Sequence, residues 1–312
     1  GRLTVTMKKK LLIALALFVG FPTVLLLSQL RFDIPVPDVE ARYKLKESKF
    51  MEIGGMRVHY TDEGKGEVVL LVHGTAASLH TWQNWVDVLK KDFRVIRMDL
   101  PAFGITGPAP DRNYSIDSYV KFLRQFLAEL KIKQVSIAGN SLGGQIAWHY
   151  TAAYPDDVNK MILIDSAGLP RLKGIPMPIR LARMPVISSL ALYISPRFLV
   201  RNSLKEVYFD SSKVTEELVD RYQTMALREG NRQAFVDRAN QLEEDSGKGL
   251  ERIKTPTLIL WGRHDRWIPV EQAENFRKKM PWSQVIIYDN AGHIPHEEIP
   301  EQTLADTVKF LK

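Results

Sequence analysis

The sequence predicts an α/β protein built on a mostly parallel β-sheet that helices cover on both faces. Two observations carry this prediction. Short apolar runs with few charges recur along the chain, as expected for strands that are buried on both faces. Amphipathic helical patterns lie between most of these runs, and such an alternation is typical of parallel strands joined by crossover helices.

Eight strand-like runs are predicted, and the first two form a hairpin. Residues 50–53 and 56–61 are separated by two glycines, which is a hairpin signal. The clearest helix is predicted over 116–130, where apolar residues repeat at helical spacing and Ser115 can cap the first turn. The six later strand-like runs are 68–72, 94–98, 134–138, 161–164, 257–260 and 285–288.

One long interval interrupts the alternation of strands and helices. No good strand pattern occurs over 168–252, and this length is too great for a loop in a compact domain. We therefore predict a helical insertion there, with helices near 213–227 and 233–242, between the two parts of a core domain, 50–167 and 253–312. The first part of the insertion is rich in proline, which predicts an irregular apolar surface that packs on the sheet domain or lines a substrate pocket.

The amino-terminal residues 1–30 form a separate unit, which a proline-containing linker over 31–49 joins to the folded body. Three lysines precede the uncharged segment 11–30, which is long enough to cross a bilayer. Lysines favour the cytoplasmic side, so we expect a membrane anchor with the rest of the protein outside the cytoplasm. A cleaved secretory signal is the alternative, although no clear small-residue cleavage site lies near 28–30.

The composition disfavours nucleic acid as a partner and excludes cysteine chemistry. The formal net charge is +7, from 43 basic and 36 acidic residues. Four of the basic residues lie in the first ten positions, and without them the balance is 43 − 4 = 39 against 36, or +3. A weakly basic body of mixed charge gives nucleic-acid binding little support. The chain has 0 cysteines, so it offers no disulfide, thiolate metal site or cysteine nucleophile.

The most informative motif is Gly-Asn-Ser-Leu-Gly at 139–143, which places Ser141 between a strand-like run and a helical pattern. A serine hydroxyl is a poor nucleophile at neutral pH, so it must be exposed on a tight turn with a base within reach. Asp265 and His293 follow the last two strand-like runs. All three residues thus lie beyond the carboxyl ends of strands, where open α/β sheets place their sites.

With this chain order, the sequence resembles the α/β-hydrolase family over residues 50–312. The resemblance implies an eight-stranded, mostly parallel sheet, and the predicted insertion matches the helical cap of that family. One departure is Ala102, where many relatives have glycine. The resemblance rests on Val-His-Gly at 72–74, Asp-Leu-Pro at 99–101, the serine motif at 139–143, the segment 261–265 and Gly-His at 292–293.

The same resemblance implies a role for each candidate residue. Ser141 would be the nucleophile, His293 the general base and then the general acid, and Asp265 the carboxylate that orients the imidazole. The backbone N–H groups of Leu142 and Thr75 would form the oxyanion hole. No cofactor is expected.

Several neighbouring residues remain as alternatives or supports. Asp165 ends another strand-like run and is a second possible position for the acid. His264 and His296 are expected to be hydrogen-bonding supports, and His73 is expected to brace the oxyanion loop. No spacing of histidines and carboxylates predicts a metal site.

The resemblance implies a serine carboxylic ester hydrolase, an esterase or lipase acting on a small-molecule or lipid ester. A serine at 141 argues against the branches of the family that use aspartate there. One alternative is a carbon–carbon bond hydrolase of ring-cleavage products, although a tryptophan commonly follows the histidine in those enzymes and Ile294 follows it here. The other alternative is a non-catalytic, ligand-binding member of the fold.

Overall fold

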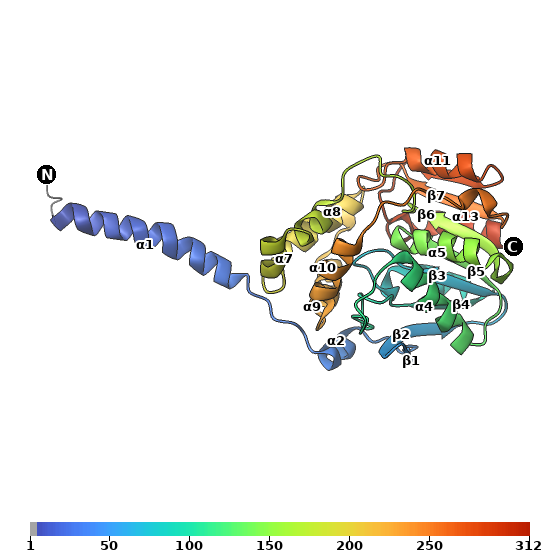
Figure 1. The fold of residues 1–312 in the computed structure, drawn as a ribbon, viewed down its shortest axis with the longest axis horizontal. Helices are drawn as coiled ribbons and strands as arrows, with labels where there is room; N and C mark the ends of the chain where they lie inside the picture. The colour runs from blue at the N-terminus through green and yellow to red at the C-terminus, as the bar shows by residue number, and fades with distance from the viewer. Residues whose placement is uncertain (1–4) are drawn as a thin grey trace.

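The computed structural model describes residues 5–312, and its body is an eight-stranded sheet with the strand order β1-β2-β4-β3-β5-β6-β7-β8 (Figure 1). The pairs β1–β2 and β2–β4 are antiparallel, and every other neighbouring pair is parallel. The predicted α/β class and the mostly parallel sheet are therefore confirmed. The strands are β1 Lys49–Ile53, β2 Met56–Glu63, β3 Val68–Val72, β4 Arg94–Met98, β5 Val135–Asn140, β6 Val158–Ile164, β7 Thr257–Gly262 and β8 Gln284–Tyr288.

Helices cover both faces of the sheet because its central strands are apolar on both sides. In β3, Leu70 and Val72 enter one hydrophobic core, while Val69 and Leu71 enter the other. The first core lies under α4, α5 and α11, and the second lies under α3 and α13. The bounds of these helices are α3 Gln83–Leu89, α4 Ile116–Glu129, α5 Leu142–Ala153, α11 Glu271–Lys279 and α13 Pro300–Leu311; α12 is the short turn Pro295–Glu298.

A helical insertion separates β6 from β7, as the sequence predicts. Its first part, however, is helical where the sequence predicts an irregular surface. Prolines begin these helices instead of preventing them, because the fixed φ of proline suits the first helical turn. We call this insertion the cap. Its helices are α6 Met177–Ala182, α7 Pro185–Ala191, α8 Arg197–Val207, α9 Glu216–Leu227 and α10 Asn231–Gln241.

The amino-terminal segment projects from the body as the single helix α1 Val5–Ser28, of which no residue is buried (Figure 1). It is long and apolar enough to cross a membrane. The backbone N–H of Arg31 donates to the carbonyl oxygen of Tyr193 at 2.7 Å, so α1 ends beside the turn between α7 and α8. Only the carboxyl end of the membrane segment predicted over 11–30 therefore lies at the edge of the cap.

The linker predicted over 31–49 contains a helix that the sequence analysis missed, α2 Val36–Tyr43. Val39 is fully buried and packs with Ile105 of the core and Met225 of the cap. This short helix is stabilised by the burial of one apolar side chain between two other segments. The pattern of its eight residues does not by itself predict a helix.

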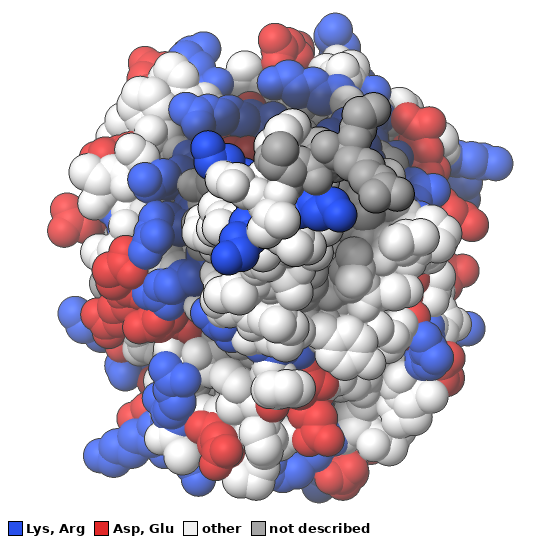
Figure 2. Space-filling view, turned by 90° about the vertical axis from the view of Figure 1, so that its left-hand side faces the viewer, with Lys and Arg blue, Asp and Glu red and all other residues white. Residues whose placement is uncertain are grey.

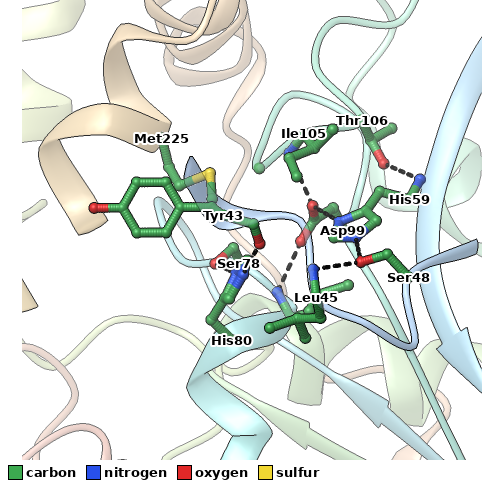
Figure 3. Close-up of polar contacts among 12 residues, drawn as sticks. Tyr43, Leu45, Ser48, His59, Ser78, His80, Asp99, Ile105, Thr106 and Met225 are labelled. Carbon is green, nitrogen blue, oxygen red and sulfur yellow. Dashed lines mark hydrogen bonds and ion pairs between the residues drawn. The ribbon is translucent and has the colours of Figure 1, made fainter. Parts of the chain in front are cut away.

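A buried hydrogen-bond network around Asp99 fastens the end of this linker to the core (Figure 3). The Nδ1 atom of His59 lies 2.8 Å from Oδ2 of Asp99, and its Nε2 atom lies 2.6 Å from Oγ of Ser48. The backbone N–H groups of Leu79 and Ile105 donate to the same carboxylate at 2.8 Å. Burial alone would raise the pKa of Asp99, but the adjacent His59 brings it below its usual value.

Candidate active site

Ser141 lies on a sharp turn between β5 and α5. Its backbone φ is 54° and its ψ is −117°, a conformation that L-residues rarely adopt and that costs about 1–3 kcal/mol. The surrounding structure holds this conformation, since the N–H of Ser141 donates to the carbonyl oxygen of Ile164 at 3.0 Å. The sequence motif thus forms the tight turn between strand and helix that it predicts, with Ser141 half-buried at its tip.

The glycines of the motif are required because backbones meet closely at this turn. A Cβ atom added to Gly143 would lie 2.1 Å from the carbonyl oxygen of Val72, and one added to Gly139 would lie 2.1 Å from that of Gly143. Real Cβ atoms do not approach so closely, so only glycine allows the strand and the helix to meet here.

His293 and Asp265 meet beside this turn, at the ends of β8 and β7. The Nδ1 atom of His293 lies 2.6 Å from Oδ2 of Asp265, and both side chains are buried. The other carboxylate oxygen, Oδ1, accepts the backbone N–H groups of Trp267 and Ile268 at 2.8 and 2.9 Å. Asn140 donates to the carbonyl oxygen of His293 at 3.0 Å, which ties the histidine loop to the serine turn.

Asp165, the alternative position for the acid, lies behind Asp265. Its carboxyl group accepts the backbone N–H of Gly262 at 3.1 Å, and complete burial followed by the nearby Asp265 raises its pKa well above the usual value. A protonated Asp165 can donate a hydrogen bond to Asp265, which leaves Asp265 as the charged partner of His293. Possible metal-binding atoms of Asp165, Asp265 and His293 lie within 4.8 Å of one another, a spacing that would also suit a metal ion. In this structure the same side chains take part in the hydrogen bonds described above.

One cavity of about 110 Å³ joins the candidate catalytic groups to the cap. Ser141, His293, Thr75 and Leu142 all line it, so the predicted nucleophile, base and oxyanion donors share one space. The cap also contributes to the lining, which includes Ile179, Arg238 and Leu242, and the loop before it contributes Arg171 and Leu172. The arrangement of a strained serine, a carboxylate-oriented histidine and two backbone donors suits acyl transfer.

Comparison with known families agrees with this geometry. The protein family described as "alpha/beta hydrolase fold" matches residues 67–300 of this chain. The chain belongs to the α/β-hydrolase family. Among curated relatives, this α/β-hydrolase is 30% identical over 272 residues to the 2-hydroxy-6-oxo-6-(2'-aminophenyl)hexa-2,4-dienoic acid hydrolase of Metapseudomonas resinovorans, across 84% of this chain and 90% of that protein.

Two solved structures show the range of its similarities. A bacterial membrane phospholipase A matches with a TM-score of 0.73 and 25% identity, over 98% of this chain and 96% of that chain. A meta-cleavage product hydrolase from Pseudomonas fluorescens IP01 matches with a TM-score of 0.75 and 26% identity, over 84% of this chain and 97% of that chain. The chain is thus a serine hydrolase of this fold, and the names of these two structures belong to different reaction classes.

Two of the three supporting histidines of this α/β-hydrolase make the hydrogen bonds that the sequence analysis expects. His73 places Nδ1 2.7 Å from the carbonyl oxygen of Gly74, and its Nε2 accepts the N–H of Leu100 at 2.9 Å. His296 places Nε2 3.0 Å from the hydroxyl of Thr81.

The expectation for His264 is wrong. This side chain is exposed and stacks on Phe209 of the cap, with ring centroids 3.9 Å apart. An aromatic partner that is distant in the sequence therefore replaces the expected hydrogen bond.

The charged groups of the cavity wall were not predicted from the sequence. Arg238 lies on α10 and only 6% of it is exposed, yet a charged residue in a helix ordinarily indicates a solvated face. Asp245 accepts a hydrogen bond from Gln145 at 2.8 Å and lies 2.6 Å from Nε2 of His149. No local pattern marks these residues, because the fold of the cap over the sheet brings them to the cavity.

Proposed function

We propose that this α/β-hydrolase is a membrane-anchored serine hydrolase that cleaves carboxylic esters with apolar acyl chains. In the proposed mechanism, the hydroxyl of Ser141 attacks the acyl carbon while Nε2 of His293 accepts its proton. Asp265 fixes the tautomer of His293 through Nδ1 and stabilises the imidazolium that forms. The backbone N–H groups of Leu142 and Thr75 would bind the oxyanion.

The second half of the reaction reverses these proton transfers. His293 gives its proton to the alcohol oxygen, which leaves, and the acyl group stays on Ser141. The same imidazole then takes a proton from water as the water oxygen attacks the acyl carbon. It returns this proton to Oγ of Ser141 when the bond between that oxygen and the acyl carbon breaks and the acid leaves. Burial and Asp265 raise the pKa of Asp165 well above its usual value, which favours the neutral form and so opposes a second negative charge beside the imidazole.

The proposal that the esters have apolar acyl chains rests on the position of α1. This apolar helix ends at the cap, and apolar side chains of the neighbouring cap surface are exposed, among them Val186 at 75%, Tyr193 at 59% and Phe198 at 54%. Figure 2, which views the protein from the side from which α1 projects, shows uncharged side chains on and beside this helix, with basic and acidic side chains around them. Such a surface fits a bilayer that holds ester substrates.

Membrane anchorage by α1 is part of the proposal. The lysines at its amino end favour the cytoplasmic side, which would place the catalytic body outside the cytoplasm. Alkaline washing of membranes tests the anchor: the full chain should stay with the pellet, and a chain that begins at Arg31 should be released. Release of both forms would contradict anchorage.

The ester proposal is tested by turnover of p-nitrophenyl esters with acyl chains from acetyl to palmitoyl by the purified full-length protein in detergent. We expect cleavage that Ser141→Ala abolishes. Ser212→Ala is the matched control, because this serine lies in the cap outside the cavity lining and bonds to Asp210. Equal activity of Ser141→Ala and the wild type would overturn the assignment.

Hydrolysis of a carbon–carbon bond is the second candidate, because the curated relative that is 30% identical is a dienoic acid hydrolase. The same serine and histidine could serve a ketone that leaves a stabilised carbanion. Loss of colour from a dienol ring-cleavage substrate measures this activity directly. Turnover of that substrate at a higher kcat/KM than any ester would favour the second candidate over the first.

A further inference from the structure

Arg238 is a buried cation in the cavity that also contains Ser141. Only 6% of the residue is exposed, and it lines the cavity wall from α10 of the cap. Within residues 5–312, which the structure describes, no aspartate or glutamate forms an ion pair with it, and none is among the groups that shift its pKa. An ionised group removed from water without a counter-charge is costly, so such a group needs a specific reason to be there.

Three other buried or half-buried arginines of this protein do have carboxylates. Arg97 lies 3.5 Å from Glu63, and Arg221 lies 2.6 Å from Glu297. On the same helix as Arg238, Arg232 pairs with Asp33 at 2.8 Å. Arg238 therefore differs from these three arginines. It also differs from the half-buried Arg228, which has no ion pair with the described residues but donates to the backbone carbonyl oxygens of Ile105 and Thr106 at 3.1 Å.

The surroundings of Arg238 increase its need for an anion. Its guanidinium carbon lies 6.0 Å from the centroid of the Phe103 ring, and its polar neighbour is the neutral hydroxyl of Tyr119. Burial lowers the pKa of Arg238, and the nearby cation Arg171 lowers it further. Both cations line the same cavity, although like charges repel.

The acids of the cavity wall do not neutralise this pair. Asp245 is engaged by Gln145 and His149. Glu243 also lines the cavity, but Arg171 donates to its backbone carbonyl oxygen, at 3.3 Å, and not to its carboxylate.

We infer that Arg238, assisted by Arg171, is a specificity-determining subsite for an anionic oxygen group, a carboxylate or a phosphate, carried by the substrate. This inference rests on the proposed ester hydrolysis for the reaction, and on the cavity alone for the binding. A planar guanidinium matches both groups with paired hydrogen bonds, and the burial of Arg238 strengthens them. A neutral substrate would be the poorer ligand, since it would leave the guanidinium buried and unpaired.

Two matched pairs of esters test the subsite with the full-length protein. The carboxylate pair is mono-p-nitrophenyl glutarate and its methyl ester, and the phosphate pair is a lysophosphatidic acid and the monoacylglycerol with the same acyl chain. We expect the wild type to prefer the anionic member of at least one pair. Arg238→Met should lower that preference in kcat/KM by about tenfold or more, the effect of losing a charged hydrogen bond in a buried site.

Two variants separate recognition from folding. Arg238→Lys keeps the charge without the planar fork and should recover part of the preference, while Arg232→Met, on the same helix with its own acid partner, should leave the preference as in the wild type. The pair that responds identifies the carboxylate or the phosphate as the ligand group. An unchanged preference in Arg238→Met, or an equal loss of preference in Arg232→Met, would overturn the subsite.

Binding distinguishes failure of the subsite from failure of the proposed reaction. In the Ser141→Ala background, calorimetry should show tighter binding of the anionic glutarate ester than of its methyl ester, and Arg238→Met should remove the difference. If no ester is cleaved but this difference is present, ester hydrolysis is wrong and the subsite stands. If esters are cleaved and the difference is absent, the subsite is wrong and ester hydrolysis stands.

Discussion

The Nδ1 atom of His293 lies 2.6 Å from Oδ2 of Asp265, and the second oxygen of the same carboxylate accepts two backbone N–H groups. Both carboxylate oxygens are therefore occupied, and the carboxylate cannot rotate without losing hydrogen bonds. The imidazole of His293 is held with Nε2 as its free nitrogen, in the cavity that contains Ser141. This relationship has a direct catalytic consequence.

Asp265→Asn should lower kcat by about a thousandfold or more, because an amide N–H facing His293 would favour the tautomer that cannot accept the proton of Ser141. The fold should survive, since the amide oxygen can still accept the N–H groups of Trp267 and Ile268. Steady-state hydrolysis of p-nitrophenyl butyrate measures the effect. Asp289→Asn, an exposed aspartate paired with Arg263, is the control and should stay near wild-type activity. Comparable kcat values for the two variants would remove Asp265 from the proposed mechanism.

Asp165→Asn should stabilise the protein more at pH 8 than at pH 5. Burial and Asp265 raise the pKa of Asp165 from 3.8, so above about pH 4 the folded state keeps a proton that the unfolded state releases. The free energy of unfolding of the wild type then falls as the pH rises above about 4, by up to about 1.4 kcal/mol per pH unit. Asp165→Asn has no proton to lose at this position and should not show this fall. Thermal unfolding of both proteins at the two pH values measures this. The same shift in Tm at both values would contradict a neutral Asp165.

Glu297→Gln should loosen the cap, because Glu297 of the core accepts hydrogen bonds from Arg221 at 2.6 Å and Tyr222 at 3.0 Å, both on α9. Removing the charge leaves Arg221 largely buried without a counter-ion, at a cost of about 2–3 kcal/mol. We expect a lower Tm and faster proteolytic cleavage within the cap. Glu216→Gln, whose ion pairs with Arg197 and Arg201 are exposed, should change Tm little. Equal effects of both variants would show that the buried pair does not hold the cap.

The sequence predicts those parts of the fold whose signals are local. Continuous apolar strands, the helix capped by Ser115 and the glycines around Ser141 each fix their own conformation, and parallel strands bring their carboxyl ends together. The side chains at those ends could therefore be placed in one site before the structure was known.

Features that depend on distant partners are not visible in the sequence. The helix α2 exists because Val39 packs between Ile105 and Met225, which lie 66 and 186 positions further along the chain. Arg238 has the sequence context of a solvated helical residue, and only the seating of the cap on the sheet buries it. Tertiary packing overrides local pattern at both positions.

His80→Gln should make the protein less sensitive to acid. Burial lowers the pKa of His80 from 6.5 to about 4, although Asp99 and the hydrogen bond of its Nε2 to the carbonyl oxygen of Tyr43, at 2.8 Å, act in the opposite direction. Between these pH values the unfolded state binds a proton that the folded state does not, so stability rises with pH across this window by up to about 1.4 kcal/mol per unit. Glutamine can keep the donor to Tyr43 without titrating.

We therefore expect the Tm of the wild type to fall from pH 7 to pH 4.5 more steeply than that of His80→Gln. The Tm of His80→Gln should still fall somewhat with decreasing pH, since burial also lowers the pKa of His296, to about 3. His264→Gln is the matched control, because this histidine is exposed and stacked on Phe209. Its Tm should fall with decreasing pH as steeply as that of the wild type. If His80→Gln and His264→Gln share the wild-type slope, the contact between the linker and His80 does not contribute to acid sensitivity.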